Sequence, residues 1–433
     1  MIPLLSAGEM READARAVAT RGQDHLVAAA GIAVGLEAKR LLGSCYGRRV
    51  AVIVGPGLNG ADGRVSAEWL RGRGALVDLI EVATQPDVIS GYDLLIDAAF
   101  GLGCSRPYVA PRVTPGTLVL CVDLPSGVDA DEGILLGQPL RATSTLALGA
   151  LKFAHVTGHA SDYVGEIRFA GLGIVEDASS GMVEDSDMHN LVRIKRDDHK
   201  WTHAVQVFAG SRFMPGAGAL VARGAMAGGA SMVCLSSRGE QVDTSDVPPE
   251  VVRTSDTAID PRCRAVVAGP GLGQEAGSWL APRLADARVP VVLDADGLER
   301  SLLSAISQRE WVLTPHQGEF ERLIGGPLPA SRLSAVKLLA LETRCIVLLK
   351  GSTTLIADPA GRVRVVQSGT PALATAGSGD VLAGLIAAAI ARGHEPLEAA
   401  ALAAHLHGRA GARMPTYGSA TDLLSILSRT LHD

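Results

Sequence analysis

The sequence predicts an α/β protein made of two different α/β domains in tandem, and three observations support this prediction. At 433 residues, the chain is longer than one hydrophobic core usually organises. In each half, short apolar runs alternate with glycine-containing loops and amphipathic segments, the pattern of βαβ units in a parallel sheet. Between the halves, Ile174 to Lys200 is polar and acid-rich without a clean period, which indicates a linker. We therefore expect domains at residues 1–190, linker included, and 191–433.

The first half opens with two segments of helical periodicity, Glu9–Ala19 and Asp24–Leu42. The apolar runs that follow predict strands buried on both faces: Arg49–Val54, Leu76–Val82, Leu94–Asp97 and Thr117–Val122. Between the first two strands, Ala61–Arg71 has the pattern of a crossover helix, so these strands are expected to run parallel.

The second half repeats the alternation with different sequences. Its expected strands are Ala204–Ala209, Ser231–Leu235, Ala265–Ala268, Val291–Leu293 and Cys345–Leu349. Its clearest helical segments are Gly216–Gly228, Val381–Ala391 and Pro396–Arg413. Pro396 suits the first turn of a helix, where its missing N–H costs nothing. Because the halves do not repeat one another, we expect two unlike domains.

Composition excludes several classes of protein. Hydrophobic residues make up 47% and charged residues 20% of the chain, which is typical of a folded globular protein. The formal charge of −6 leaves no basic surface for nucleic acid. The six cysteines are dispersed without a Cys-x-x-Cys pair, so they predict small buried side chains and no disulfide framework or zinc site. Without a secretion signal or a long apolar run, we expect a cytoplasmic protein with no membrane span.

The segment from Pro371 to Gly384 is the most informative about function. Its small residues, Ala374 to Gly379, predict a tight loop ahead of a buried helix. Free N–H groups and the macrodipole at such a helix N-terminus favour an anion such as phosphate, and glycine lets its oxygens approach the amides. Asp380 follows at the mouth of this loop. The residue could act on a ligand there, or it could simply cap the helix.

Other polar or glycine-rich clusters follow several of the expected strands. They are Ala209-Gly210-Ser211, Gly269-Pro270-Gly271-Leu272-Gly273, Asp294-Ala295-Asp296-Gly297, Thr314–Phe320 and Lys350–Thr354. Open parallel sheets bind their ligands at the carboxyl ends of the strands, where these clusters lie. One such cluster could be a tight turn, and Asp294 alone could cap a helix. So many at strand ends favour a ligand site.

In order and composition, these segments resemble the ribokinase-like NAD(P)H-hydrate dehydratase family. The resemblance runs from about Asp198 to about Arg413 and includes the Thr-Pro-His-x-Gly-Glu element at 314–319, which related sugar and vitamin kinases lack. It implies a ribokinase-like domain that acts on NADH or NADPH after water has added to the nicotinamide ring (NADHX or NADPHX). The family phosphorylates the new hydroxyl from ADP or ATP and then eliminates phosphate.

The resemblance also implies roles for individual residues. Asp380 would be the general base that takes the proton of the substrate hydroxyl. The hydrated nucleotide would contact Ala217, Gly271, Gly273, His316 and Asp380. The adenine nucleotide would lie against Lys350, Gly351, Ser352, Thr353, Thr354, Gly377, Ser378 and Gly379. Mg²⁺ would neutralise its phosphates, with Asp294 and Glu319 as outer helpers. Alternatively, His316 is a satisfied loop histidine and Lys350 an exposed cation.

The first half contains a phosphate cradle of its own. Val50–Val54 runs into Gly55-Pro56-Gly57-Leu58-Asn59-Gly60-Ala61-Asp62-Gly63, a strand, a glycine loop and the start of a helix. Its glycine spacing differs from the dinucleotide-binding fingerprint. Two more clusters, Asp97–Gly103 and Val122–Asp129, also follow strands, so the three loops could meet at one rim of the sheet. Asp62 has a simpler alternative role as the cap of its helix.

Together these loops resemble the NAD(P)H-hydrate epimerase domain, over about Ser6 to Gly173, and Lys152 fits the same pattern. The resemblance implies a Rossmann-like three-layer sandwich in which Asn59, Asp97 and Ser126 hold K⁺. Asp123 would act as acid or base in exchanging the C6 configuration of the hydrated ring. The substrate would contact Leu58, Asn59, Gly60, Ala61, Asp62, Gly101, Leu102, Gly103, Cys104, Ser105, Arg106, Pro107 and Asp123.

Two positions depart from the family pattern of adjacent asparagines and a double glycine. Leu58 replaces the first asparagine and removes a polar side chain, and Ala61 replaces a glycine and adds a Cβ beside the phosphate path. These changes leave open a first half that only binds or assembles subunits.

Both epimers form when NAD(P)H is hydrated, so the two resemblances together imply a bifunctional repair enzyme, which we expect to form a homo-oligomer. The other alternative is a kinase of the ribokinase superfamily that releases a stable phosphorylated product.

Overall fold

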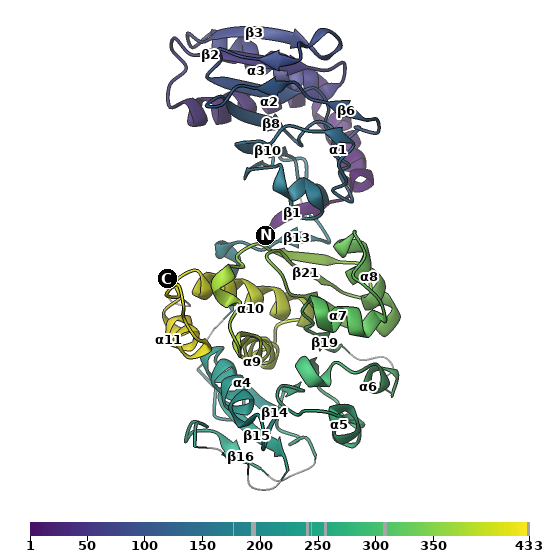
Figure 1. Cartoon of the computed structure of the whole chain (residues 1–433), viewed down its shortest axis with the longest axis vertical. Coiled ribbons are helices and arrows are strands. Elements are labelled where there is room, and N and C mark those ends of the chain that lie inside the picture. Colours follow the sequence, from purple (N-terminus) through teal and green to yellow (C-terminus); the bar gives the residue numbers. More distant parts are fainter. Residues whose placement is uncertain are drawn as a thin grey trace. The chain divides into compact units, whose positions relative to one another are not determined.

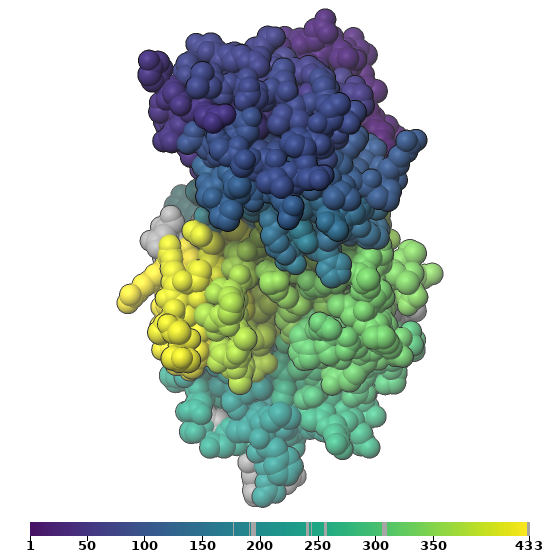
Figure 2. Space-filling model, turned by 45° about the horizontal axis from the view of Figure 1, so that its top comes forward, coloured from purple at the N-terminus to yellow at the C-terminus, as the bar shows by residue number. Residues whose placement is uncertain are grey.

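The computed structural model describes residues 1–175, 177–191, 196–239, 242–243, 245–254, 258–305 and 310–430. The chain divides into two compact units, Ile2–Gly181 and Met182–Asp433, the latter with Met1 (Figure 1). This division falls a few residues before the boundary at 190 that we expected from the sequence. In Figure 2 the residues of the first unit run from purple to teal-blue, and most of the second unit is green to yellow.

The N-terminal unit is built on six strands in the order β12-β10-β8-β5-β2-β3, and all neighbours are parallel. This confirms the predicted direction of the sheet and its four predicted strands. The sequence analysis did not identify β10 and β12. The bounds are β2 (Arg49–Val54), β3 (Leu76–Glu81), β5 (Leu94–Ala98), β8 (Leu118–Val122), β10 (Ser144–Leu148) and β12 (Glu166–Ala170).

Helices cover one face of this sheet and short strands with loops cover the other. Buried side chains of α2 (Gln23–Leu42) and α3 (Leu58–Arg71) pack on one face. On the opposite face, Ile89, Tyr108 and Leu140 cover the strands. The remaining elements are α1 (Ala7–Arg21), β1 (Ile2–Leu5), β4 (Val88–Ile89), β6 (Tyr108–Val109), β7 (Arg112–Val113), β9 (Gly137–Gln138), β11 (Leu151–Lys152) and the 3₁₀ turns Val82–Thr84, Phe153–His155 and His159–Asp162.

One strand expectation was wrong. We expected Leu76–Val82 to be buried on both faces, but β3 is the last strand of its sheet and ends at Glu81. Buried and exposed side chains do not alternate regularly along β3, and Leu76 is 62% and Leu79 38% exposed. A short apolar run does not reveal whether a second neighbour strand is present, because apolar side chains also occur on edge strands.

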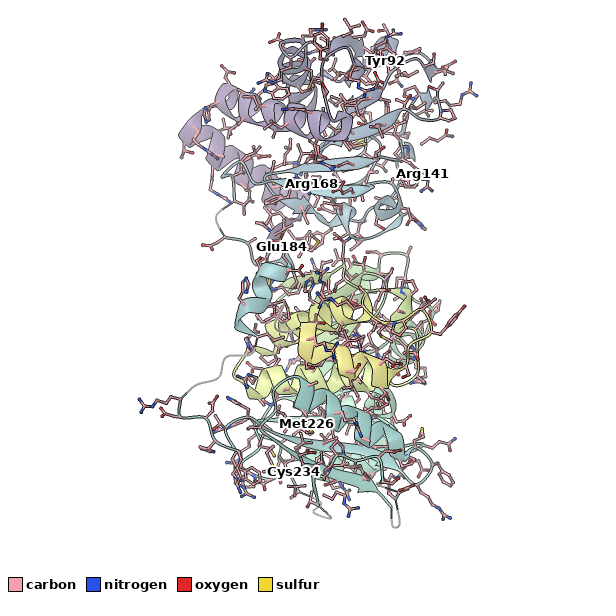
Figure 3. The ribbon with its side chains drawn as sticks, turned by 90° about the vertical axis from the view of Figure 1, so that its left-hand side faces the viewer. Tyr92, Arg141, Arg168, Glu184, Met226 and Cys234 are labelled. Carbon is pink, nitrogen blue, oxygen red and sulfur yellow. The ribbon has the colours of Figure 1, made fainter. Side chains whose placement is uncertain are left out.

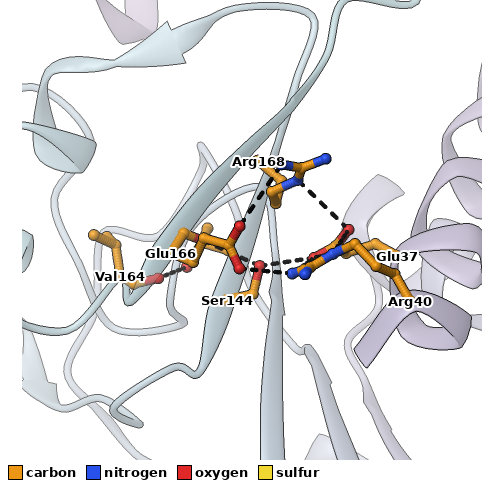
Figure 4. A network of polar contacts seen from close by, with 7 residues as sticks. Glu37, Arg40, Ser144, Val164, Glu166 and Arg168 are labelled. Atoms are coloured by element: carbon orange, nitrogen blue, oxygen red, sulfur yellow. Dashed lines mark hydrogen bonds and ion pairs between the residues drawn. The ribbon is translucent and has the colours of Figure 1, made fainter. Parts of the chain in front are cut away.

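An ion-pair network ties α2 to the strands at the other edge of the sheet (Figure 4). The buried Glu37 of α2 accepts hydrogen bonds from Arg40 and, at 2.9 Å, from the Ser144 hydroxyl of β10. Arg40 also bonds to Glu166 of β12, and Arg168 lies 3.8 Å from Glu37. The buried carboxylate is thus compensated by donors from both the helix and the sheet.

The C-terminal unit has a larger sheet in the order β22-β21-β20-β19-β18-β17-β14-β15-β16. The strands from β16 to β20 are parallel, as predicted, and β21 and β22 are antiparallel additions. The bounds are β14 (Ala204–Ser211), β15 (Met232–Arg238), β16 (Val252–Arg253), β17 (Ala265–Ala268), β18 (Val291–Leu293), β19 (Val312–Leu313), β20 (Ile346–Leu349), β21 (Thr354–Ala357) and β22 (Val363–Val366). Gly181–Met182, at the division between the units, is β13.

Helices lie on both sides of this sheet (Figure 1). The core of the unit gathers α4, α9, α10 and α11, and α9 is buried almost throughout. Met226 of α4 packs against this core and Cys234 lies on β15 (Figure 3). The bounds are α4 (Pro215–Ala227), α5 (Ala276–Leu284), α6 (Arg300–Ala305), α7 (Gln317–Ile324), α8 (Arg332–Thr343), α9 (Ser378–Ala391), α10 (Pro396–Gly411), α11 (Ala420–Thr430) and the 3₁₀ turns Asp185–Asn190, Ala295–Gly297 and Pro371–Leu373.

Within the part of the chain that the structure describes, no helix combines the length and the apolar composition needed to cross a bilayer.

Candidate active sites

In the C-terminal unit, a cavity of about 640 Å³ opens where β18, β19 and β20 end and α9 begins. Its lining brings together side chains that lie far apart in the sequence, among them Asp294, His316, Lys350 and Asp380. Parallel strands end at the same edge of a sheet, which explains why these four loops meet.

The N-terminus of α9 lies in the tight glycine loop that the sequence predicted, and residues Gly377–Gly379 are called the anion loop for the role that we expect of them. The helix begins at Ser378, and Gly377 precedes it with φ +85°, a left-handed conformation that favours glycine. Asp380 is therefore the third residue of the helix and not its cap, so the capping alternative was wrong. The buried His407 of α10 lies with its Nε2 2.9 Å from the Ser378 carbonyl and braces the loop from behind.

A charge network fills the floor of this cavity. Lys350 Nζ lies 2.9 Å from Asp294 Oδ1 and 3.8 Å from Glu319 Oε2. The Thr314 hydroxyl donates to the same Asp294 oxygen at 2.9 Å. Lys350 is thus a partly buried, paired cation, and the alternative that it is an exposed strand-end cation was wrong. Asp294 likewise has no capping hydrogen bond, because its carboxylate is engaged here.

Asp380 lies beside this network and is largely withdrawn from water. Its burial raises the pKa of the carboxyl to about 7, and the negative charge of Asp294 adds to the effect while Lys350 opposes it. A carboxyl with this pKa exchanges protons readily near neutral pH, which suits a general base.

His316 has a structural role that does not remove it from the cavity. It caps α7, its Nδ1 accepting from the Glu319 N–H at 3.3 Å while Glu319 accepts from the His316 N–H at 2.8 Å. The imidazole is 59% exposed and lines the cavity, so a ligand can still contact it. His316 is therefore hydrogen-bonded within its own loop, as the alternative expected, and it also lies at the cavity, where a substrate could contact it.

The remaining residues predicted for this unit divide into two groups. Gly351, Ser352, Thr354, Gly377, Ser378 and Gly379 line the cavity with Lys350, whereas Thr353, Ala217, Gly271 and Gly273 do not. Ala217 and Gly271 nevertheless adjoin one another, because a Cβ on Gly271 would lie 2.6 Å from that of Ala217. The Gly273 N–H donates to the Asp296 carboxylate, and the negative charge of Asp296 contributes to the raised pKa of Asp380. The loop that contains Gly271 and Gly273 therefore lies near Asp380.

The N-terminal unit has a cavity of about 520 Å³ at the carboxyl ends of β2, β5 and β8. Of the residues predicted to contact substrate there, those that line it are Leu58, Asn59, Asp62, Gly101, Leu102, Gly103, Cys104 and Asp123. Gly60, Ala61, Ser105, Arg106 and Pro107 do not line it. Gly60 has a packing role instead, because a Cβ there would collide with the Gly55 carbonyl.

Asp97 and Ser126 form a buried cluster beside this cavity. The Ser126 hydroxyl donates to Asp97 Oδ1 at 2.6 Å, and the Ser126 N–H donates to Oδ2 at 2.9 Å. Asn59 lines the cavity near Gly101, and its Nδ2 is buried without a hydrogen-bond partner among the described residues. Burial raises the pKa of Asp97, which has only neutral donors around it in the described part of the chain. A bound cation would compensate the Asp97 carboxylate, so this cluster of oxygens fits K⁺.

Three carboxyl groups and one lysine surround the inner end of the N-terminal cavity. Asp62 of α3, Asp14 of α1, Asp123 and Lys152 all line it, and Asp123 forms an ion pair with the buried Lys152. Gly57, and not Asp62, precedes the first residue of α3, so the alternative that Asp62 caps its helix was wrong. Burial, Asp123 and Asp14 raise the pKa of Asp62 to about 8.

Sequence reasoning missed Asp14 and His407. Each contributes a side chain from a helix that has no motif of its own, and helical periodicity shows only which residues share a face. Among the described residues, no cluster of three or more His, Cys, Asp or Glu side chains could hold a metal ion. The Asn59, Asp97 and Ser126 cluster combines a carboxylate with an amide and a hydroxyl and is of a different kind.

Comparisons with known proteins agree for both units. A family model described as NAD(P)H-hydrate dehydratase matches residues 205–432, and one described as YjeF-related protein N-terminus matches residues 23–90 and 80–154. The bifunctional NAD(P)H-hydrate repair enzyme Nnr of Mycobacterium tuberculosis is 36% identical over 437 residues, covering 92% of this chain and 90% of the relative. The enzyme of the same description from Gloeobacter violaceus is 35% identical over 84% of each chain.

A solved structure resembles the C-terminal unit. The ADP/ATP-dependent NAD(P)H-hydrate dehydratase of Bacillus subtilis, co-crystallised with ATP and Mg²⁺, is 29% identical with a TM-score of 0.51. The match covers 57% of this chain and 96% of that one, so one unit corresponds to the whole relative.

Proposed function

The chain belongs to the family of bifunctional NAD(P)H-hydrate repair enzymes, and we propose that its two units share the repair of hydrated NADH and NADPH. The C-terminal unit removes water from the S epimer with ADP or ATP as phosphoryl donor. The N-terminal unit interconverts the R and S epimers, so that both can be recovered. The placement of Asp380 between the anion loop and the Lys350 network is the observation that carries the dehydratase assignment.

Dehydration needs a better leaving group than hydroxide. Asp380 takes the proton of the C6 hydroxyl, and the hydroxyl oxygen forms a bond to the terminal phosphorus of the nucleotide. The bond from that phosphorus to its bridging oxygen breaks at the same time and releases AMP from ADP, or ADP from ATP. The N–H groups of Gly377 and Gly379 at the start of α9 stabilise the charge on the transferred phosphoryl group, while the Ser378 N–H donates to the Thr375 carbonyl at 3.3 Å. The C6–O bond then breaks, phosphate leaves with its electron pair, and C5 gives up a proton to water, so that the C5=C6 double bond of NADH or NADPH is restored.

Lys350 and its partners position the adenine nucleotide. The ammonium of Lys350 lies beside Gly379 and can contact the nucleotide phosphates. Mg²⁺ would neutralise those phosphates, and the oxygens of Asp294 and Glu319 on the same side of the cavity are donors that this ion prefers.

In the N-terminal unit we assign the proton transfers to Asp123, which lines the cavity in its ion pair with Lys152. K⁺, held by oxygens of Asn59, Asp97 and Ser126, would balance the buried Asp97 charge and order the loops against the substrate. Leu58 lines the cavity in place of the family's asparagine and supplies apolar contact there. Because the substrates are soluble nucleotides, we place the enzyme in the cytoplasm, and we expect a homo-oligomer.

Two substitutions test this division of labour on one chain. Asp380→Asn should lower dehydration of S-NADHX by about 10²–10⁴-fold and leave epimer exchange intact. Asp123→Ala should do the reverse. Chromatographic separation of the epimers and recovery of NADH absorbance measure the two rates in the same sample, with the exposed Asp246→Asn and Asp87→Asn as controls. Loss of both activities in either single variant would contradict separate sites.

A further inference from the structure

We propose that Asp62 is the proton donor for epimerisation and that, with Asp123, it opens the hydrated ring between C6 and N1. The inference rests on the proposed epimerase activity and goes beyond it by naming a second catalytic residue and the bond that breaks. It follows from how differently the structure surrounds the two carboxyl groups.

Asp62 presents an uncommitted carboxyl group to the cavity. The residue belongs to the early part of α3, is 7% exposed and lines the cavity with Asp123. Within the described part of the chain, no hydrogen bond engages its side chain. Buried polar groups are normally paired, and those that are not commonly serve a ligand. A substrate nitrogen or hydroxyl is the partner that this cavity can receive.

The surroundings of Asp62 favour its protonated form. Burial is the largest effect, and the charges of Asp123 and of Asp14 on α1 act in the same direction, raising the pKa of Asp62 to about 8. At neutral pH most of the enzyme therefore carries a neutral acid at this position. Asp14 does not need to touch the substrate for this effect, so we assign it as a positioning residue.

Asp123 is held differently, in a buried ion pair. Its Oδ1 pairs with the ammonium of Lys152 and accepts a hydrogen bond from the Leu148 N–H at 3.2 Å. Lys152 is itself 1% exposed and also donates to the carbonyls of Leu148 and Ala150. An ammonium held in this way stabilises the carboxylate. One cavity thus holds an uncommitted carboxyl group, Asp62, and one paired with an ammonium, Asp123, and such unequal surroundings suit the acid and the base of one reaction.

Such a pair fits ring opening. The hydrated ring carries its hydroxyl on C6, next to N1. Asp123 takes the hydroxyl proton, the O–H electrons form the C6=O bond, and the C6–N1 bond breaks. Its electrons go to N1, which takes the proton of Asp62. Rotation about C5–C6 turns the other face of the aldehyde to N1, and closure returns both protons to their original carriers.

The competing route loses water from C6 and adds it back from the opposite face. In that route the acid ends ionised and the base ends protonated after each turnover. Both routes pass through this state, with the proton on Asp123 beside the Lys152 ammonium and the charge on Asp62 beside Asp14. Loss and re-addition of water ends the turnover in it, whereas ring opening holds it only in the open-chain intermediate. Ring opening instead restores the starting protonation in both directions and needs no co-reactant. We therefore assign ring opening.

The first test replaces the acid with its isostere. In the full chain with ADP, Mg²⁺ and K⁺, Asp62→Asn should lower kcat for epimer exchange by about 10²-fold or more while KM changes little. Dehydration of S-NADHX by the same sample should be unchanged, which shows that the chain is folded. Asp87→Asn, an exposed change on the same unit, serves as the matched control. An Asp62→Asn variant that retains more than about a third of the exchange rate would overturn the proposal.

The second test concerns Asp14 and the pH profile. Epimerisation should fall as pH rises past about 8, because Asp62 then loses its proton. Asp14→Asn removes a negative charge and should move this limb to lower pH. The other charged groups that line the cavity near Asp62 are Asp123, Lys152 and Arg11, and they are unchanged in this variant. If the alkaline limb of the pH profile were unshifted in Asp14→Asn, Asp14 would not influence the protonation of Asp62.

Isotope exchange distinguishes the two routes. In H₂¹⁸O, ring opening predicts that the C6 oxygen is retained through most turnovers, whereas loss and re-addition of water exchanges it once per epimerisation. Mass spectrometry of the isolated epimers reads this directly. Stoichiometric exchange would overturn the ring-opening assignment. Wild-type exchange no faster than the spontaneous rate would instead refute the epimerase activity itself, which keeps the two failures apart.

Discussion

The Asp380 carboxyl lies between the anion loop of α9 and the Asp294–Lys350 pair, in surroundings that hold its pKa near 7. Burial and the charge of Asp294 disfavour the ionised form, and the Lys350 ammonium keeps the shift moderate. A base of this strength is mostly ionised at cellular pH and can still release its proton once phosphoryl transfer is complete. These surroundings are the ones that suit Asp380 to the role of general base that we propose for it.

This pKa predicts the pH dependence of dehydration. General-base catalysis needs ionised Asp380, so kcat should fall about tenfold for each unit below pH 7 and level off above about pH 8. Initial rates of NADH recovery from purified S-NADHX, from about pH 6 to about pH 9, measure the profile. A rate that is flat across this range would show that Asp380 does not limit the reaction as a base.

At the scale of elements, glycine geometry shapes the anion loop. Gly377 takes a left-handed conformation, and a Cβ on this residue would collide with Leu220 of α4. Gly377→Ala should therefore destabilise the unit by about 1–2 kcal/mol and raise KM for ADP by about tenfold or more, because the loop amides move. Thermal unfolding and ADP titration of the dehydratase rate measure the two effects.

Gly361, in the turn between β21 and β22, provides the matched control. It has φ +86°, with open space around its missing Cβ. Gly361→Ala should cost similar stability through backbone strain and leave KM for ADP unchanged. If both variants changed KM equally, the effect of Gly377→Ala would reflect general loosening of the fold and not the anion loop.

Local patterns in the sequence were enough to predict most elements of both sheets, because buried parallel strands have continuous apolar runs and crossover helices lie between them. They failed where the neighbours of an element decide the outcome. Leu76–Glu81 is an edge strand because no further described strand pairs with it in its sheet, and β21 pairs antiparallel with both of its neighbours, β20 and β22. The start of α3 at Leu58 also places Asp62 inside the helix, a position that capping preferences alone did not reveal.

The candidate sites were likewise predictable where local sequence patterns suffice and not where the packing of distant elements decides. Residues in strand-end loops, such as Asp123, Asn59 and Asp380, could be proposed from the sequence, because strand ends converge in parallel sheets. Asp14 could not, because it contributes to the site from a helix through the folding of α1 over the cavity. The pairing of Asp123 with Lys152, and hence the unequal surroundings of the two acids, is likewise a property of the folded unit.

At the scale of the whole molecule, the two sites act on the same metabolite in sequence. Epimerisation in the N-terminal unit supplies the epimer that dehydration in the C-terminal unit consumes. Because dehydration is driven by phosphoryl transfer, it draws the epimer equilibrium toward S until neither hydrate remains. A chain with both activities therefore completes a repair that either unit alone would leave unfinished.

The most direct measurement is the recovery of NADH absorbance from a mixture of R- and S-NADHX, with the intact chain, ADP, Mg²⁺ and K⁺. We predict complete recovery at a rate above spontaneous epimerisation. Recovery that stops at the S fraction and then proceeds only at the spontaneous rate would contradict an active N-terminal unit. No recovery with either ADP or ATP would contradict the repair function as a whole.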